Sequence, residues 1–497
     1  MIKQNIKLLI WISIIFIGFL LFNSWQYDVK NINQYNVNDA VFDSNAINYN
    51  YNDQPNLFKN EIFIDTDLIS VKINLNGGDI TYLSLKKYLK SLNKENDGGI
   101  VIFDDVDKYY FAQSGILNNF DLNNKSYIYS SDKVSYKLNK GDSFLEVILN
   151  YDSEDITMKK IYTFSSFSYS IKVGYLISNK KDTEFRGKLY GLLKQKISTT
   201  SSFFNTGIKS YEGIAFYTKD KPYKKVSYDS VSSKKPCELV NGGWISMIEH
   251  YFLSSWIPFQ DFSYIYSVEN LKDNLYIAKY ISEKDFIISP GEFLLIESNL
   301  FVGPKIKSEL NNLANGLNLA IDYGIFWPIA SPIFFILSKI YNFVGNWGLS
   351  IILVTVLIKL FFFQLSSISY KSMGNMKKIQ PKLDILKERY KDDKKKFGQE
   401  VMELYKKEKV NPFSGCLPIL IQIPVFISLY YVLLESVELR HSPFIFWLND
   451  LSSKDPYYIL PIIMSFTMYL QQKLNPPVQD PLQNKIMMFM PVFFLIL

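Results

Sequence analysis

The sequence predicts a polytopic α-helical membrane protein with an inserted all-β domain and a cytoplasmic helical hairpin. Three observations support this fold class. Apolar runs suited to lipid lie at the N-terminus and again after residue 344. Between them, residues 56–310 show the two-residue alternation and frequent turn residues of short strands. A lysine-rich segment at 366–415 carries apolar residues at helical spacing.

Composition and charge narrow the functional classes. The 497 residues allow two or more domains, and a net charge of +6 does not indicate a specific nucleic-acid partner. The cysteines, Cys237 and Cys416, are far apart in the sequence, and the histidines, His250 and His441, are isolated. This pattern predicts no disulfide, no metal site and no histidine-based catalytic triad.

Residues 1–25 predict a transmembrane anchor. Lys3 and Lys7 precede an apolar stretch at 8–22, and no small-x-small cleavage site follows. A cleaved signal peptide is the alternative, but an uncleaved anchor with its N-terminus in the cytoplasm fits the pattern better. Residues 26–55 are rich in Asn, Asp and Tyr, which predicts a polar linker.

Residues 56–310 predict an antiparallel β-sandwich outside the cytoplasm. The run LISVKINLNGGDITYL alternates, and its Asn76-Gly77-Gly78-Asp79 offers a hairpin turn. Further strands are expected in SFLEVILNY, MKKIYTFSSFSYSIKVGYLI, LYIAKYI and EFLLIESNLFVG.

The apolar segment 325–343 is interrupted by Pro328 and Pro332. Reading it as a further membrane span would put the β domain and the next helix on inconsistent sides. We therefore expect an amphipathic helix in the outer interface, from about residue 332 to residue 343.

The remaining apolar runs predict transmembrane helices at 345–365, 416–436 and 457–472, with a fifth beginning at 486–497. The loop 366–415 holds thirteen Lys and Arg against seven Asp and Glu, whereas the loop 437–456 holds two against three. The positive-inside rule then puts 366–415 and 473–485 in the cytoplasm and residues 26–344 and 437–456 in the periplasm. Because twelve helical residues span only about 18 Å, we expect the given sequence to stop part-way through the fifth helix.

The cytoplasmic loop has the pattern of an antiparallel coiled-coil hairpin. Its two apolar seams are Met376, Ile379, Leu383, Leu386 and Tyr390, and then Phe397, Val401 and Leu404. The lysines either keep the hairpin soluble and fix topology, or they form a docking surface for a ribosome or another partner. The docking candidates are Lys377, Lys378, Lys387, Arg389, Lys394 and Lys395.

Lys359 lies inside an otherwise apolar predicted span, where a charge costs about 2.5–3.5 kcal/mol. Its side chain either reaches back to the cytoplasmic interface or faces a hydrated groove. The groove is favoured because Thr355, Lys359 and Ser366 share one helical face and the next span contributes Gln422. We include Phe426, one turn beyond Gln422, in this candidate substrate-binding set.

Several stretches resemble the YidC family of membrane protein insertases. They are FVGNWGLSIILVTVLIK, VNPFSGCLPILIQIPVFISLYYVLLESVELR, DPYYILPIIM and, upstream, GGWISMIEHYFLSSWIP. The resemblance covers essentially the whole chain and is most specific at 411–440.

The resemblance implies a hydrophilic intramembrane groove with a basic residue on its first core helix, a position that Lys359 occupies. It also implies acidic or polar tails of nascent membrane proteins as substrates, cooperation with the Sec translocon, contact with lipids and no cofactor. The β domain would be a super-sandwich similar to sugar mutarotases. Relatives of this type usually carry arginine where this chain has Lys359, so bidentate recognition of a carboxylate is lost.

An alternative function remains open from the sequence. A membrane-anchored periplasmic carbohydrate-active enzyme would need paired carboxylates or a His–Glu pair in one pocket of the β domain. His250 beside Glu249 is the pair that the sequence offers.

Overall fold

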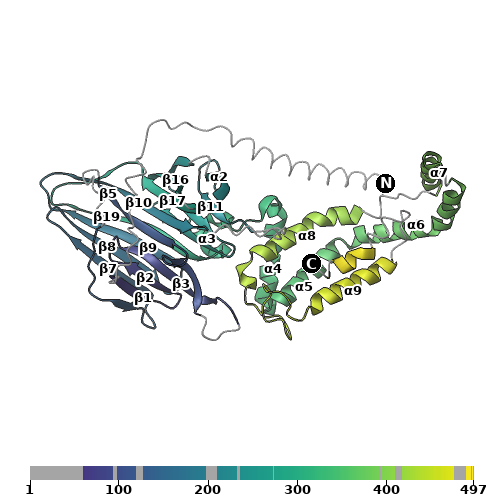
Figure 1. Cartoon of the computed structure of the whole chain (residues 1–497), viewed down its shortest axis with the longest axis horizontal. Coiled ribbons are helices and arrows are strands. Elements are labelled where there is room, and N and C mark those ends of the chain that lie inside the picture. Colours follow the sequence, from purple (N-terminus) through teal and green to yellow (C-terminus); the bar gives the residue numbers. More distant parts are fainter. Residues whose placement is uncertain are drawn as a thin grey trace. The chain divides into compact units, whose positions relative to one another are not determined.

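The computed structural model describes residues 60–92, 98–118, 127–197, 210–231, 236–271, 274–390, 393–408, 417–474, 488–493 and 495. The chain divides into two compact units, a β-rich unit within Asn36–Asp322 and a helical unit within Tyr323–Leu497 (Figure 1). The predicted anchor at 1–25 and the predicted linker at 26–55 lie outside the described residues.

The β-rich unit contains two sheets. The larger, eleven-stranded among the described residues, has the spatial order β13 (Cys237–Asn241), β16 (Ser263–Leu271), β17 (Leu275–Ser282), β10 (Phe185–Lys196), β5 (Tyr110–Asn118), β4 (Gly99–Asp104), β3 (Asp79–Leu89), β2 (Ile69–Asn74), β1 (Glu61–Asp65) and β6 (Ser135–Lys137), with β18 (Phe286–Ile288) paired to β10. The smaller, eight-stranded there, has the order β12 (Lys224–Val226), β11 (Gly213–Phe216), β14 (Ile245–Ile248), β15 (Phe252–Pro258), β19 (Phe293–Pro304), β9 (Ser170–Asn179), β8 (Ile156–Ser165) and β7 (Phe144–Asp152). Short helices α2 (Tyr228–Val231), α3 (Lys307–Leu313) and η4 (Leu317–Ala320) complete the unit.

The two sheets form a sandwich because alternate residues of their strands face each other. On β8 the inward residues are buried, including Met158, Tyr162 and Phe164. Polar contacts also cross between the sheets. The Trp256 indole on β15 donates to the Leu192 carbonyl on β10 at 3.0 Å.

The predicted strands and turn are confirmed. Strands β2 and β3 pair antiparallel with Asn74 opposite Asp79, and the turn between them uses positive φ at Gly77 (88°) and Gly78 (65°). Among the described strand pairs, β1 and β6 depart from the predicted antiparallel arrangement because they are parallel.

The helical unit consists of α4 (Trp327–Val344), α5 (Trp347–Phe361), α6 (Phe363–Arg389), α7 (Lys394–Lys407), α8 (Leu417–Glu435) and α9 (Ile459–Leu474), with short turns η5 (Gly324–Phe326) and η7 (Val437–Leu439). Residues 488–493 are helical as well. The Ser465 hydroxyl on α9 donates to the Pro491 carbonyl at 2.9 Å.

Local sequence fixes the corner between α4 and α5. Gly345 ends α4 with φ 72°, and its N–H donates to the Tyr341 carbonyl at 2.7 Å. Asn346 then caps α5 by accepting from the Leu349 N–H at 3.0 Å. The Tyr341 and Trp347 rings stack across this corner at 4.0 Å.

Helix α4 differs from the expected interfacial helix in its bounds. It begins at Trp327, with Pro328 in the first turn, and continues through Pro332, so it is longer than the segment from about 332 to 343. Among the described residues, Gly324–Val344 is the one helical segment long and apolar enough by itself to cross a membrane. Its placement in the outer interface stays a prediction.

The predicted span 345–365 is not one straight helix. Helix α5 ends at Phe361, and α6 starts at Phe363 with a bend of 60° between them; this bent pair would count as a second membrane-crossing candidate if it forms a single span. No proline or glycine marks the break. The Phe362 N–H is shared between the Ile358 and Leu360 carbonyls, which is the tightened last turn of a helix end.

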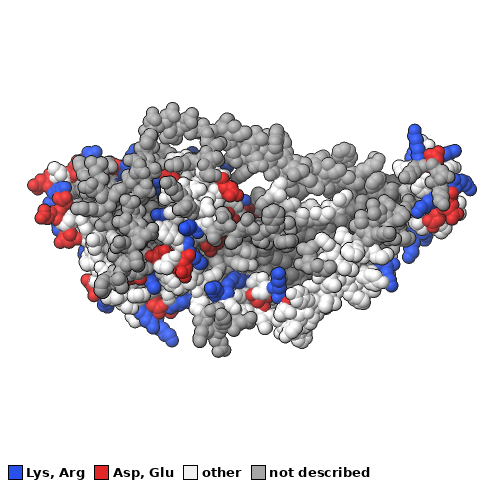
Figure 2. Space-filling view, viewed as in Figure 1, with Lys and Arg blue, Asp and Glu red and all other residues white. Residues whose placement is uncertain are grey.

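Helices α6 and α7 form a hairpin with a small apolar core. Ile379, Leu383 and Val401 are buried together, and Met376, Phe397, Leu404 and Tyr405 pack against them. An ion pair between Lys382 and Glu408, at 2.6 Å, joins the two helices. Figure 2 shows charged side chains gathered over this hairpin, whereas the surface over α9 is largely uncharged.

The connection from α8 to α9 is braced by two aspartates. Asp450 accepts from the His441 N–H and from the hydroxyls of Ser452 and Ser453, at 2.6–2.9 Å. Asp455 accepts from the Trp447 indole at 3.0 Å and from the Leu460 N–H at 2.8 Å, at the start of α9. These bonds to the charged form hold the pKa of both carboxyls below the usual range, although partial burial acts in the opposite direction.

Candidate functional site

The candidate site lies where the last turn of α5 faces the first half of α8. Lys359 is on α5, and its Nζ lies 5.2 Å from the centroid of the Phe426 ring on α8. Phe426 is 47% exposed. A cation over an aromatic face is attracted by the ring quadrupole, so this contact fixes the ammonium beside an exposed apolar surface.

Gln422 lies one turn before Phe426 on the same helix. Its Nε2 is buried and has no hydrogen-bond acceptor among the described residues. Pro424, in the next turn of α8, has no N–H, so it leaves a helix carbonyl without its usual donor. An unused amide donor and an interrupted ladder give this part of α8 a polar character inside an apolar helix.

The structure brings together only part of the predicted set. Thr355 lies on α5 one turn before Lys359, but its hydroxyl donates to the Ile352 carbonyl at 2.7 Å. Ser366 lies on α6, beyond the bend at Phe362. Because α5 and α6 are separate helices, Ser366 and Lys359 do not share the one continuous helical face that the sequence predicts.

No described carboxylate lies within 4.0 Å of Lys359, although acidic groups occur elsewhere in the unit. Glu435, the last residue of α8, is only 1% exposed, and sequence reasoning missed it as a buried acid. Its position directly after an apolar run was the available signal. Glu438 follows in η7, and burial raises the pKa of its carboxyl.

The predicted docking residues lie on the hairpin surface. Lys377, Lys378, Lys387, Arg389 and Lys395 are all exposed, while the side chain of Lys394 lies outside the described part of the chain. The hairpin therefore presents basic side chains on both of its helices.

The β-rich unit gives little support to the enzyme alternative. Glu249 is held by the Gln195 amide at 3.4 Å, and burial raises the pKa of its carboxyl. His250 stacks on the neighbouring Tyr251 at 3.9 Å. A depression of about 530 Å³ on this unit is lined by neither Glu249 nor His250. Within the described residues, no group of three or more His, Cys, Asp or Glu side chains could hold a metal ion.

Comparison with known proteins covers both units. Residues 61–336 match the family described as "YidC periplasmic domain", and residues 339–497 match the "60Kd inner membrane protein" family. The membrane protein insertase YidC of Stutzerimonas stutzeri is 42% identical over 436 residues, covering 87% of this chain and 78% of the relative. That of Legionella pneumophila strain Paris is 42% identical over 510 residues, covering 98% and 91%.

Among solved structures, the matches cover about half of this chain at low identity. A galactose mutarotase related enzyme from Lactobacillus acidophilus aligns with a TM-score of 0.32 and 11% identity, over 49% of this chain and 97% of that one.

A β-sandwich that matches a periplasmic-domain family, followed by apolar helices that match an inner-membrane protein family, defines the class of inner-membrane insertases with a large periplasmic domain. The chain belongs to the YidC family of membrane protein insertases. These relatives support the insertase function predicted from the sequence and not the carbohydrate-active alternative.

Proposed function

We propose that this chain inserts inner-membrane proteins and helps them fold by offering Lys359 as an attracting charge in a polar intramembrane groove. The observation that carries the proposal is the position of the Lys359 ammonium over Phe426, one turn from the unused Gln422 amide. Both α5 and α8 belong to the part of the chain that matches the inner-membrane family.

The exposed surfaces of these helices support a lipid or substrate-helix environment. Leu357, Leu360 and Phe361 on α5 are 49%, 63% and 81% exposed. On α8 and α9 the exposed apolar residues include Leu420, Phe426, Ile462 and Phe466. Surfaces this apolar are stable only against lipid or another apolar segment. We propose that α5, α8 and α9 cross the membrane and that α4 lies in its outer interface.

The ammonium of Lys359 makes the groove prefer acidic groups of a substrate. A carboxylate in the tail of a substrate would be drawn towards it, and the Gln422 amide could donate to the same group. Lys359 offers a single point charge, so the recognition would be of charge and not of a planar carboxylate geometry. Thr355 and Ser366 would contribute polarity along the groove.

The partners follow from the proposed topology. The substrates are nascent membrane proteins, inserted by this chain alone or together with the Sec translocon. The basic hairpin, with Lys377, Lys378, Lys387, Arg389, Lys394 and Lys395, would dock a ribosome or another partner at the cytoplasmic face. The mechanism needs no cofactor, because the step is one of binding and transfer.

The test is an insertion assay in proteoliposomes. A short single-span substrate with an acidic N-terminal tail is added, and protection of the tail from protease is measured for the wild type and for Lys359→Ala. We expect insertion to fall about tenfold or more, since hydrogen bonds to charged groups contribute about 1.5–3 kcal/mol. Lys359→Arg should retain insertion.

Lys339 supplies a matched control. It lies on α4 with its Nζ 5.6 Å from the Phe335 ring, so Lys339→Ala removes a similar cation–aromatic contact elsewhere in the same unit. Insertion should be unchanged by that variant. Equal insertion by Lys359→Ala and wild type would reduce Lys359 to a side chain that only reaches the interface.

A further inference from the structure

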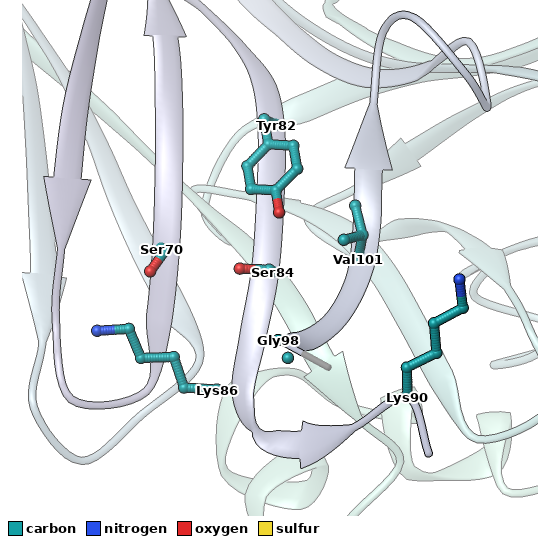
Figure 3. Close-up of a pocket in the computed structure, with 8 residues that line it drawn as sticks. Ser70, Tyr82, Ser84, Lys86, Lys90, Gly98 and Val101 are labelled. Carbon is teal, nitrogen blue, oxygen red and sulfur yellow. The ribbon is translucent and has the colours of Figure 1, made fainter. Parts of the chain in front are cut away.

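The outer face of the larger sheet carries a polar depression that the insertion mechanism does not use. It lies across β2, β3 and β4 and has a volume of about 530 Å³ (Figure 3). This volume is in the range of ligand pockets, about 300–1,000 Å³. Ser70, Tyr82, Ser84, Lys86 and Lys90 line it.

The depression offers hydrogen-bond donors that the described residues leave unused. Tyr82 and Ser84 are two residues apart on β3, and Figure 3 shows the Tyr82 hydroxyl directed towards Ser84. Ser84 is only 7% exposed. No described group accepts a hydrogen bond from Tyr82, Ser84 or the exposed Lys90.

Lys86 is fixed in place on the other side of the depression. Its ammonium pairs with Asp65 at 2.5 Å and donates to the Thr66 carbonyl at 2.6 Å. Ser70 also donates to Asp65, at 2.8 Å. These bonds lower the pKa of the Asp65 carboxyl despite its partial burial. The carboxylate therefore stays ionised and bound to Lys86 and Ser70.

Two further lysines, Lys72 and Lys90, lie at or beside the depression, while Asp104, opposite Tyr82 on β4, accepts from the Val106 and Asp107 N–H groups. Lys72, in the neighbouring row of the same face, lies with its Nζ 5.2 Å from the Tyr82 ring centroid. Asp65 is already engaged by Lys86, so Lys72 and Lys90 are not neutralised by it. An anionic ligand would therefore be favoured over a neutral one.

Glycines shape the floor. A Cβ on Gly99 would lie 2.2 Å from the Leu85 carbonyl oxygen, so β4 can approach β3 only with glycine at this position. A Cβ on Gly98 would meet no atom within 4 Å. A side chain added at Gly98 would therefore project into open space at the depression without displacing the fold.

We propose that this depression binds carboxylate side chains of an extended acidic segment of a substrate protein. The proposal rests on the proposed insertase function. Segments that membrane proteins pass to the outer side are poor in Lys and Arg, so their charge comes mostly from Asp and Glu. A lysine-rich, hydroxyl-lined depression complements such a segment.

The test measures peptide binding to the full chain in lipid nanodiscs by fluorescence anisotropy. The probes are a labelled twelve-residue Asp/Ser peptide and its Asn/Ser counterpart. We expect the acidic peptide to bind at least tenfold more tightly, and Lys90→Glu and Gly98→Val each to weaken it at least tenfold. Because Lys90→Glu leaves the backbone untouched, it keeps the test valid if Gly98→Val does not fold.

Lys159→Glu is the matched control. Lys159 is exposed on β8 of the smaller sheet, and its substitution makes the same change of net charge. If Lys159→Glu weakens binding as much as Lys90→Glu, general electrostatics explain the result and the site is overturned. Equal binding of the two peptides also overturns it. Competition by free glutamate or phosphate at the affinity of the peptide would identify a small-anion site instead of a segment-binding site.

The same nanodiscs separate this proposal from the insertion mechanism. If the depression does not bind the acidic peptide, insertion should still occur and should still be sensitive to Lys359→Ala. Failure of the insertion mechanism would leave acidic peptide binding sensitive to Lys90→Glu while Lys359→Ala has no effect on insertion.

Discussion

The β-rich unit and the helical unit treat apolar and charged residues in opposite ways. In the β-rich unit, large side chains such as Trp244 and Trp256 are almost completely buried. In the helical unit, Phe361 and Phe343 are 81% and 93% exposed. The first unit completes its own core, whereas the second leaves large apolar side chains exposed, which fits the proposed membrane-spanning helices.

One lysine in each unit makes the contrast concrete. Lys160 on β8 is fully buried, and its ammonium donates to the carbonyls of Gly77, Gly78 and Ser114 at 2.8–3.2 Å. Lys359 is exposed and rests on an aromatic ring. The ammonium of Lys160 is fully hydrogen-bonded within the β-rich unit, where it links the two sheets. The ammonium of Lys359 is exposed and can interact with a bound substrate.

The strongest test of this contrast is Lys160→Met. It removes all three hydrogen bonds and leaves Asp79 without its nearby cation, so we expect a loss of about 3–5 kcal/mol of unfolding free energy. Hydrogen exchange of amides in β5 and β8 of the full chain measures it. The exposed neighbour Lys159→Met should change stability by less than about 0.5 kcal/mol. Equal stability of the two variants would contradict the interpretation that Lys160 stabilises the packing of the two sheets.

Within the helical unit, the hairpin core should behave like the β-rich unit on a small scale. Leu383→Ala removes a side chain that is 3% exposed, and we expect it to cost about 2–3 kcal/mol of local stability. Faster amide exchange in α6 and α7 reports this loss. Ile385→Ala, at a position 58% exposed on the same helix, should leave exchange rates nearly unchanged. Similar rates for both variants would show that the two helices do not depend on this core.

Asp79 gives the β-rich unit a pH dependence. Burial raises the pKa of its carboxyl to about 6, although Lys160 and the Gln113 amide act in the opposite direction. Between about pH 4 and 6 the unfolded chain loses this proton while the folded protein keeps it, so stability falls as pH rises. A pKa raised to about 6 corresponds to a loss of about 3 kcal/mol of unfolding free energy as pH rises. Because the Asp79 side chain is partly exposed, we expect a smaller effect, and Asp79→Asn should reduce the loss by about 1–2 kcal/mol.

The measurement for Asp79→Asn is the unfolding free energy at pH 4.5 and pH 6.5. The wild type should lose more stability over this interval than the variant. Parallel pH profiles for the two proteins would mean that another group titrates there.

The smallest expected change in stability comes from Gln422→Leu. Replacing an amide whose Nε2 has no described acceptor should be nearly neutral for folding, within about 0.5–1 kcal/mol. Insertion of the acidic-tailed substrate should nevertheless fall. A stable variant with unchanged insertion would remove Gln422 from the proposed groove, while a large loss of stability would make it a structural residue like Lys160.

The sequence predicted the strands well because alternation at a sheet face is a local signal. It did not predict the role of Lys160, although Met158, Lys160 and Tyr162 alternate on the same inward face. A lysine in that position looks like an outward residue until the Gly77–Gly78 turn of the other sheet is placed beside it. That placement is a long-range property.

The helical site was predicted only in part, because spacing along one helix is a local signal and contact between two helices is not. Lys359, Gln422 and Phe426 stand out as polar or aromatic residues at helical spacing, but the approach of Lys359 to Phe426 depends on how two helices meet. The break at Phe362 contains no proline or glycine, so the sequence predicted one helical face for Lys359 and Ser366, whereas Ser366 lies on α6. The start of α4 was missed because Pro332 was taken to mark a boundary, whereas the helix continues through it.

The order of strands in the smaller sheet also sets the earliest time at which that sheet can be completed during synthesis. Strand β9 ends at Asn179, yet it pairs with β19, which begins at Phe293 and ends at Pro304. Synthesis at about 5–20 residues per second needs roughly 6–25 s to pass from Asn179 to Pro304. During that interval the smaller sheet lacks an internal strand, so a protease or chaperone that acts on this unit meets it incompletely folded.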